Sequence, residues 1–190
     1  MLYHWRCHEA STAANPESKR YAYEAGKRAV EDFLRLRGFK GKVSHSRHLG
    51  FYHIAYEPDI FANRPDTALV GGRLLNEKNR ITGGIYTKDG TPLYEGLHKE
   101  YSGYMHRAVL AQEADMIDIR CMKASPEGEK LLEELLGLPY LKDKVSGRFD
   151  YKNSLKKEAD YRELSRKLCN MVREKGLRIV WDPSMTEKID

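Results

Sequence analysis

Cysteine is scarce in this sequence and is not arranged for disulfide or zinc chemistry. The three cysteines, Cys7, Cys121 and Cys169, are odd in number and far apart, and no C-x-x-C pair occurs. This spacing argues against a disulfide framework and against a structural zinc site. We therefore expect reduced thiols and a protein of the cytoplasm.

Long hydrophobic runs are also missing. No apolar stretch approaches the roughly 20 residues that a membrane-spanning helix needs. The first residues, MLYHWRCHEA, lack the basic segment followed by an apolar stretch that marks a signal peptide. The sequence thus predicts no membrane partner, and a protein that stays in the compartment where it is made.

Several common catalytic motifs are absent from the chain. There is no G-x-x-x-x-G-K-[ST] loop, no G-x-G-x-x-G after a strand, no G-x-S-x-G elbow and no H-E-x-x-H. These absences disfavour P-loop NTPases, Rossmann oxidoreductases, typical α/β-hydrolases and zincin proteases. The sequence therefore identifies neither a cofactor nor a metal.

Length and composition are those of one globular domain. The chain has 190 residues, of which 41% are hydrophobic and 32% charged. We predict a single α/β or α+β domain over residues 1–190, with a central mixed sheet of five or six strands flanked by helices. Residues 151–182 are a candidate C-terminal helix and strand subregion.

Capping residues, glycines and apolar spacing predict the individual elements. Helices are expected at 16–37, 97–113, 126–136 and 154–175. Strands are expected at 2–8, at 43–56 as two short strands or one strand with a bulge, in a hairpin at 82–96, at 116–122 and at 177–182. Residues 58–80 are expected to form a long loop, or a short helix with turns, in which Gly71-Gly72-Arg73 makes a turn or an anion-binding nest.

Histidines near the middle of the first half are the first candidate for chemistry. The segment contains three histidines followed by two carboxylates: His45, His48, His53, Glu57 and Asp59. On one continuous strand, His45 and His53 share a face. Convergence of the imidazoles with a carboxylate would suit zinc, iron or manganese, whereas the alternative is a polar strand facing solvent.

The beginning of the chain repeats the histidine pattern. His4 and His8 have even spacing on the predicted first strand, and Glu9 follows them. One of these imidazoles is a candidate for acid–base chemistry near neutral pH. The alternative places Trp5 and Cys7 in the core, with both histidines outside.

Basic residues interleaved with aromatic ones occur over residues 40–53. Lys and Arg neutralise phosphates, while Tyr52 and Phe61 are candidates for stacking on unpaired or flipped bases. With a net charge of +5 and a pI near 9.0, this pattern points to a nucleic-acid partner, DNA in preference to RNA. The predicted binding residues are Lys42, Arg47, Tyr52, Arg64, Arg73 and Arg80.

The segment from Gly84-Ile85-Tyr86 to Tyr94-Glu95-Gly96, with the helix expected after it, loosely resembles the GIY-YIG nuclease family. The resemblance implies a hairpin that carries two tyrosines, a following arginine and a metal-binding glutamate. The matching residues are Tyr86, Tyr94, Arg107 and either Glu127 or Glu129. The hairpin is shorter than in that family, Glu95 takes the place of an apolar residue, and the arginine comes later.

Three hypotheses for function follow from these patterns. The first is a hydrolase that cuts a phosphodiester or N-glycosidic bond in nucleic acid, as a nuclease or DNA glycosylase does. Its predicted catalytic residues are His48, His53, Glu57, Asp59 and Arg107. The second is a non-catalytic module that binds nucleic acid or protein through the same surface. The third is a transferase acting on a small phosphorylated substrate.

Overall fold

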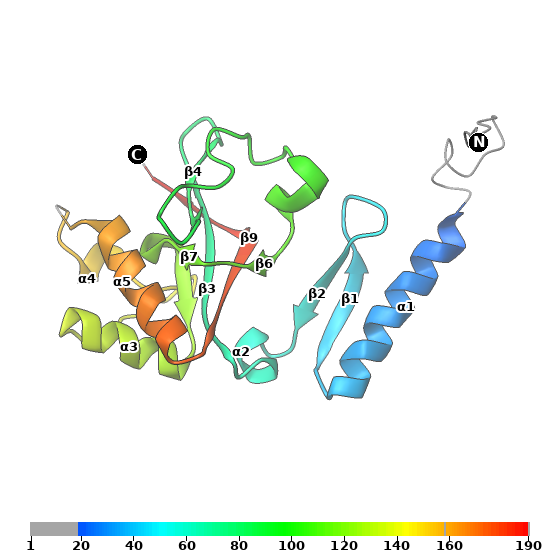
Figure 1. The fold of residues 1–190 in the computed structure, drawn as a ribbon, viewed down its shortest axis with the longest axis horizontal. Helices are drawn as coiled ribbons and strands as arrows, with labels where there is room; N and C mark the ends of the chain where they lie inside the picture. Colours follow the sequence, from blue (N-terminus) through cyan, green and yellow to red (C-terminus); the bar gives the residue numbers. More distant parts are fainter. Residues whose placement is uncertain (1–18, 158, 190) are drawn as a thin grey trace, which may run out of the picture. The chain divides into compact units, whose positions relative to one another are not determined.

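The computed structural model describes residues 19–157 and 159–189, which divide after Asn63 into two units (Figure 1). The fold combines helices with a mixed five-stranded sheet and is α+β, which confirms the predicted class. The prediction of one domain over 1–190 stays a prediction. The expected strand at 2–8, with His4, His8 and Glu9, lies outside the described residues.

A helix and a hairpin make up most of the first unit, residues 19–63. The described elements are α1 (Arg20–Arg37), β1 (Gly41–His45), β2 (Tyr52–Tyr56) and α2 (Ile60–Asn63). Gly38, at φ 70°, ends α1 in the left-handed conformation that glycine adopts without strain. β1 and β2 pair antiparallel, so the two-strand alternative for residues 43–56 is confirmed.

The second unit, residues 64–190, is built around strand β3 (Thr67–Leu75). The main sheet has the order β4-β3-β9-β6, and β8 also pairs with β3. The partner strands are β4 (Ile81–Gly83), β9 (Arg178–Lys188), β6 (Gln112–Glu113) and β8 (Met122–Ala124). β3 and β9 run parallel and the other pairs antiparallel, while β5 (Ile85–Tyr86) and β7 (Met116–Ile117) form a separate antiparallel pair.

Helices of the second unit gather on one side of its sheet (Figure 1). They are α3 (Pro126–Leu136), α4 (Tyr151–Ser154) and α5 (Tyr161–Glu174). Leu132, Leu168 and Val172 are completely buried between these helices and the strands. This burial of the helices' apolar stripes against the sheet supplies most of the unit's core.

The expected long loop at 58–80 is wrong, because it contains the central strand. Every residue of β3 except Arg73 is buried. A strand buried on both sides reads as a continuous apolar run without alternation. Its glycines are needed for close packing: a Cβ at Gly71 would lie 2.5 Å from Cβ of Ile117, and one at Gly72 would lie 2.5 Å from the Met185 carbonyl oxygen. Gly71-Gly72-Arg73 is thus neither a turn nor a nest.

The expected helix at 97–113 is also wrong. The backbone of Leu97 and Lys99 pairs instead with Ile81 and Asn79, through hydrogen bonds of 2.8 and 2.9 Å, and a turn follows in which the Tyr101 N–H donates to the His98 carbonyl oxygen. Only the 3₁₀ helix η2 (Tyr104–Val109) forms later, and it contains two residues with left-handed φ, Met105 at 53° and His106 at 59°. An α-helix cannot continue through two such residues.

Two further elements differ from their predictions in extent. The helix expected at 154–175 begins later, as α5 at Tyr161, where the Asp160 carboxylate caps it, and the separate helix α4, capped by Asp150, ends at Ser154. The strand expected at 116–122 is interrupted by the 3₁₀ helix η3 (Ile119–Cys121). By contrast, the helix predicted at 126–136 is confirmed at both ends.

The described cysteines, Cys121 and Cys169, are free and lie in the core of the second unit. Burial raises the pKa of Cys169 to about 12, so its thiol stays protonated at neutral pH. Across residues 19–157 and 159–189, none of the helices combines the length and apolar character needed to cross a membrane.

The buried carboxylate of Asp118 connects η3 with strand β5 of the second unit. Asp118 is 1% exposed and accepts from Nε and Nη2 of Arg120 at 2.8 and 2.9 Å. It also accepts from the Tyr86 hydroxyl at 2.7 Å, and burial with the nearby Asp118 charge raises the pKa of Tyr86. The Arg120 guanidinium and the Tyr86 hydroxyl both use this carboxylate as their hydrogen-bond acceptor.

Replacing Asp118 with Asn should therefore destabilise the protein strongly. The change keeps the shape but leaves the half-buried Arg120 charge without a counter-ion, which costs about 3–5 kcal/mol. Urea denaturation followed by circular dichroism measures the free energy of unfolding. Glu127→Gln, which breaks the exposed Glu127–Lys130 pair, is the control and should change it little. Equal effects of the two substitutions would contradict this account.

Candidate nucleic-acid interface

One side of the β1–β2 hairpin packs on helix α1. Val43 of β1 is buried, and it pairs with Ile54 of β2. The Tyr52 hydroxyl donates a 2.8 Å hydrogen bond to the Tyr23 carbonyl oxygen of α1. This contact requires Gly26, because a Cβ there would lie 2.1 Å from the Tyr52 hydroxyl oxygen.

The other side of the hairpin carries exposed side chains from both strands. In the register, Lys42 faces Ala55 and Ser44 faces His53 across the two strands. Directly opposed residues share a face of a sheet, so these four side chains form one surface, which we call the open face. Their types are a cation, a hydroxyl, an imidazole and a methyl group.

The prediction that His45 and His53 share a face is wrong. His45 pairs with Tyr52 on the α1 side, and its Nε2 lies 3.0 Å from a carboxylate oxygen of Glu24. His53 lies on the open face. Across the turn, even-numbered residues of β1 pair with odd-numbered residues of β2, as Ser44 does with His53. The alternation expected for one continuous strand therefore assigns His53 to the wrong face.

The predicted catalytic carboxylates have other contacts within the first unit. Glu57 forms an exposed ion pair with Lys42 at 3.4 Å. Asp59 accepts a 2.9 Å hydrogen bond from the Ala62 backbone N–H and caps α2. His48 lies in the hairpin turn, where its carbonyl oxygen accepts from the Ser46 hydroxyl. Within the described residues, no three His, Cys, Asp or Glu side chains are placed to hold a metal.

Four predicted arginines belong to the second unit and have partners there. Arg64 pairs with Asp66, and Arg107 lies in η2 with its carbonyl oxygen bonded to the Gln112 amide. The half-buried Arg73 donates to the Lys99 carbonyl oxygen, and burial lowers its pKa. The exposed Arg80 donates to the Gly96 carbonyl oxygen.

The residues that carry the GIY-YIG resemblance have structural contacts. Tyr86 is 1% exposed and Tyr94 packs 5.5 Å from the Trp181 ring, with its hydroxyl 3.1 Å from a Gln112 side-chain oxygen. Glu127 and Glu129 lie in the first turn of α3, where Lys130 and Lys142 respectively pair with them. Both tyrosines therefore belong to the packed interior of the second unit.

Positive charge is concentrated in the first unit. Residues 19–63 contain nine Lys and Arg and five Asp and Glu, which gives this unit a net charge of +4, compared with +5 for the whole chain. Six of these nine cations lie toward the ends of the hairpin, whereas Lys27 and Arg28 lie midway along α1 and Lys42 lies on β1. Those near the end of α1 and the start of β1 are Arg35, Arg37 and Lys40, and those near the start of α1 and the hairpin turn are Lys19, Arg20 and Arg47.

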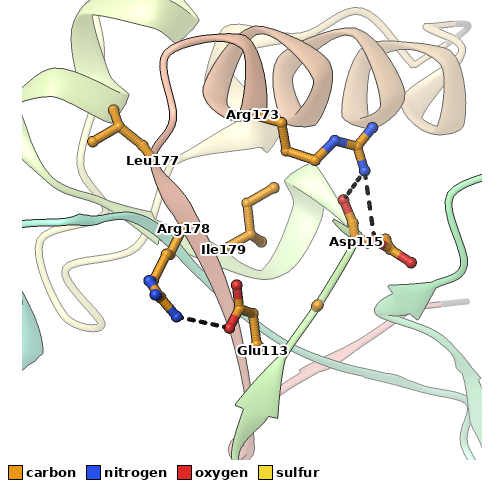
Figure 2. Close-up of a pocket in the computed structure, with 7 residues that line it drawn as sticks. Glu113, Asp115, Arg173, Leu177, Arg178 and Ile179 are labelled. Carbon is orange, nitrogen blue, oxygen red and sulfur yellow. Dashed lines mark hydrogen bonds and ion pairs between the residues drawn. The ribbon is translucent and has the colours of Figure 1, made fainter.

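Two pockets among the described residues of the second unit are lined in part by ion-paired side chains. The first, of about 250 Å³, is bordered by Arg178 paired with Glu113 and by Arg173 beside Asp115 (Figure 2). The second, of about 230 Å³, is lined in part by Arg148, which is paired with Glu187 at 2.9 Å. In both pockets cations already pair with carboxylates, although Arg148 and Lys152 share Glu187 in the second.

Comparison with known proteins gives no further guidance: no protein-family model, curated protein or solved structure matches the chain.

Sequence reasoning placed Lys42 and His53 in the binding region but missed the other half of the open face. Ser44 and Ala55 are small residues without a functional signature. The available signal was the alternation of inward and outward side chains along β1 and β2. Once the register across the turn is known, this alternation places Ser44 and Ala55 on the open face. Arg37 was missed because it ends a helix and lies outside the basic stretch 40–53, which begins at Lys40.

The packing of Tyr52 on α1 is testable by a double-mutant cycle. Gly→Ala within a helix ordinarily stabilises it by about 1 kcal/mol. Gly26→Ala should instead destabilise the hairpin, because the new methyl group collides with the Tyr52 hydroxyl. In a Tyr52→Phe background the penalty should shrink. Hydrogen exchange of peptides from 41–56 measures the effect, and an equal penalty in both backgrounds would exclude the contact.

Proposed function

We propose that residues 19–63 form a nucleic-acid-binding module in a cytoplasmic protein, and that the open face of its hairpin is the contact surface. The observation that carries the proposal is the concentration of the chain's positive charge around one exposed two-stranded ribbon. Phosphates attract such a surface because bound cations release counterions from the nucleic acid.

The acidic side chains of this unit do not cancel its charge. Glu31 and Asp32 pair with neighbouring cations on α1, and Glu57 pairs with Lys42. Each pair is neutral in itself, and the surplus of Lys and Arg remains around it. Exposed pairs of this kind contribute little stability, so a phosphate can replace the carboxylate at little cost.

The residues predicted for catalysis do not converge on one point in the first unit. Asp59 is a helix cap, Glu57 is an ion-pair partner, and His48 and His53 lie in the turn and on the open face. This arrangement favours binding without turnover, the second of the three hypotheses. Hydrolysis stays a prediction, and incubation of the bound complex with divalent metal, followed by mild alkali, tests it.

Salt dependence of binding is the direct test. The full chain should bind duplex DNA with an affinity that falls steeply between about 50 and 200 mM salt. Arg37→Gln combined with Lys40→Gln should weaken binding several-fold. It should also reduce the slope of log K against log salt by about one for each phosphate that the protein no longer neutralises.

The matched control removes two exposed charges from the second unit, with Lys144→Gln and Lys175→Gln. Both double variants lower the net charge of the protein equally. Fluorescence anisotropy with a labelled duplex measures affinity at each salt concentration. Equal weakening by the two double variants, or no binding at low salt, would exclude the first unit as the binding module.

A further inference from the structure

The geometry of the hairpin points to a more specific ligand, and we infer that the open face enters the major groove of B-form double-stranded DNA. This inference rests on the proposed nucleic-acid-binding function. A two-stranded ribbon is one of the two elements that fit this groove, which is about 12 Å wide. The described sheet of the first unit has only two strands, and α1 covers the opposite side.

The side chains of the open face are of types that recognise base edges. Lysine donates to O6 and N7 of guanine, serine bonds to several bases, and an alanine methyl group contacts the methyl group of thymine. Lys42, Ser44 and Ala55 supply these three groups. A neutral imidazole at His53 adds one donor and one acceptor.

The open face presents its side chains in two successive layers. Its side chains form two cross-strand layers, Lys42 with Ala55 and Ser44 with His53. Residues two apart on an antiparallel strand are separated by about 6.8 Å. This separation allows the two layers to contact different base pairs of one groove.

The cations at the ends of the hairpin complete the interface. The end of α1 and the start of β1 carry Arg37 and Lys40, and the turn at the other end carries Arg47. Phosphates border the major groove along its whole length, so cations at both ends of an inserted ribbon have partners within reach. The ion pair of Lys42 with Glu57 is exposed, at 84% and 56%, and can open for a base contact.

The same geometry disfavours the other nucleic acids. Double-stranded RNA has a deep and narrow major groove that side chains do not read. Single strands are bound by aromatic rings on which bases stack. The tyrosines of the hairpin, Tyr52 and Tyr56, lie on the α1 side and are half-buried, and the open face carries no Tyr, Phe or Trp; its one ring is the His53 imidazole.

Base analogues distinguish the grooves. Duplexes of about 20 base pairs, enriched from a random pool by the full chain, are resynthesised with 7-deazaguanine, which removes N7 from the major groove. A second set carries inosine, which removes the amino group from the minor groove. We expect 7-deazaguanine to weaken binding by about fivefold or more and inosine to have little effect.

Other outcomes separate this inference from the function on which it rests. Salt-sensitive binding that is unchanged by 7-deazaguanine, or weakened more by inosine, would overturn the major-groove inference and leave the proposed function standing. Equal affinity for duplex DNA and double-stranded RNA would do the same. Absence of any nucleic-acid binding would overturn both.

Substitutions on the open face give an independent readout. Ser44→Ala and His53→Ala should each reduce the preference for enriched over random duplex by about fivefold, while leaving the salt slope unchanged. The controls are Ser184→Ala and His98→Ala, exposed positions of the second unit. An unchanged preference in both open-face variants, with hydrogen exchange showing an intact hairpin, would overturn the inference.

Discussion

The contact between Tyr52 and helix α1 determines which side of the hairpin meets solvent. Because Gly26 has no side chain, the tyrosine hydroxyl reaches the Tyr23 carbonyl oxygen. Strand side chains alternate, so an inward Tyr52 requires an inward Val43 and an outward open face. The position and composition of the interface follow from which face of the hairpin packs on α1. That packing depends on the absence of a Cβ at Gly26.

The two units use charge in different ways. In the second unit, charges are paired at close range: Asp118 holds Arg120, and carboxylates pair with the cations around both pockets. Such pairing fixes geometry and offers little to an external ligand. In the first unit, cations outnumber carboxylates, and they lie on α1, on β1 and in the segments that flank the ribbon. The physical basis for binding an anionic polymer therefore lies in residues 19–63.

Local signals in the sequence predict some elements fully and others not at all. Helix α3 is predicted to the residue because Ser125, Pro126 and Gly137 are explicit start and stop signals. Strand β3 is missed because a strand buried on both sides has no periodicity, and its pair Gly71-Gly72 looks like a turn. Half of the open face is missed for a related reason. Which side chains of β2 point outward depends on how β2 pairs with β1 across the turn at 46–51. The number of residues in that turn does not determine this pairing.

Chemical-shift mapping tests the central claim most directly. Isotope-labelled full-length protein is titrated with duplex DNA, and amide shifts are followed for both units. The account predicts the largest changes at the open face, Lys42, Ser44, His53 and Ala55, with smaller changes at the cations beside the hairpin and little change in residues 64–190. Changes concentrated in the second unit, for example around Arg120 or Arg173, would contradict it.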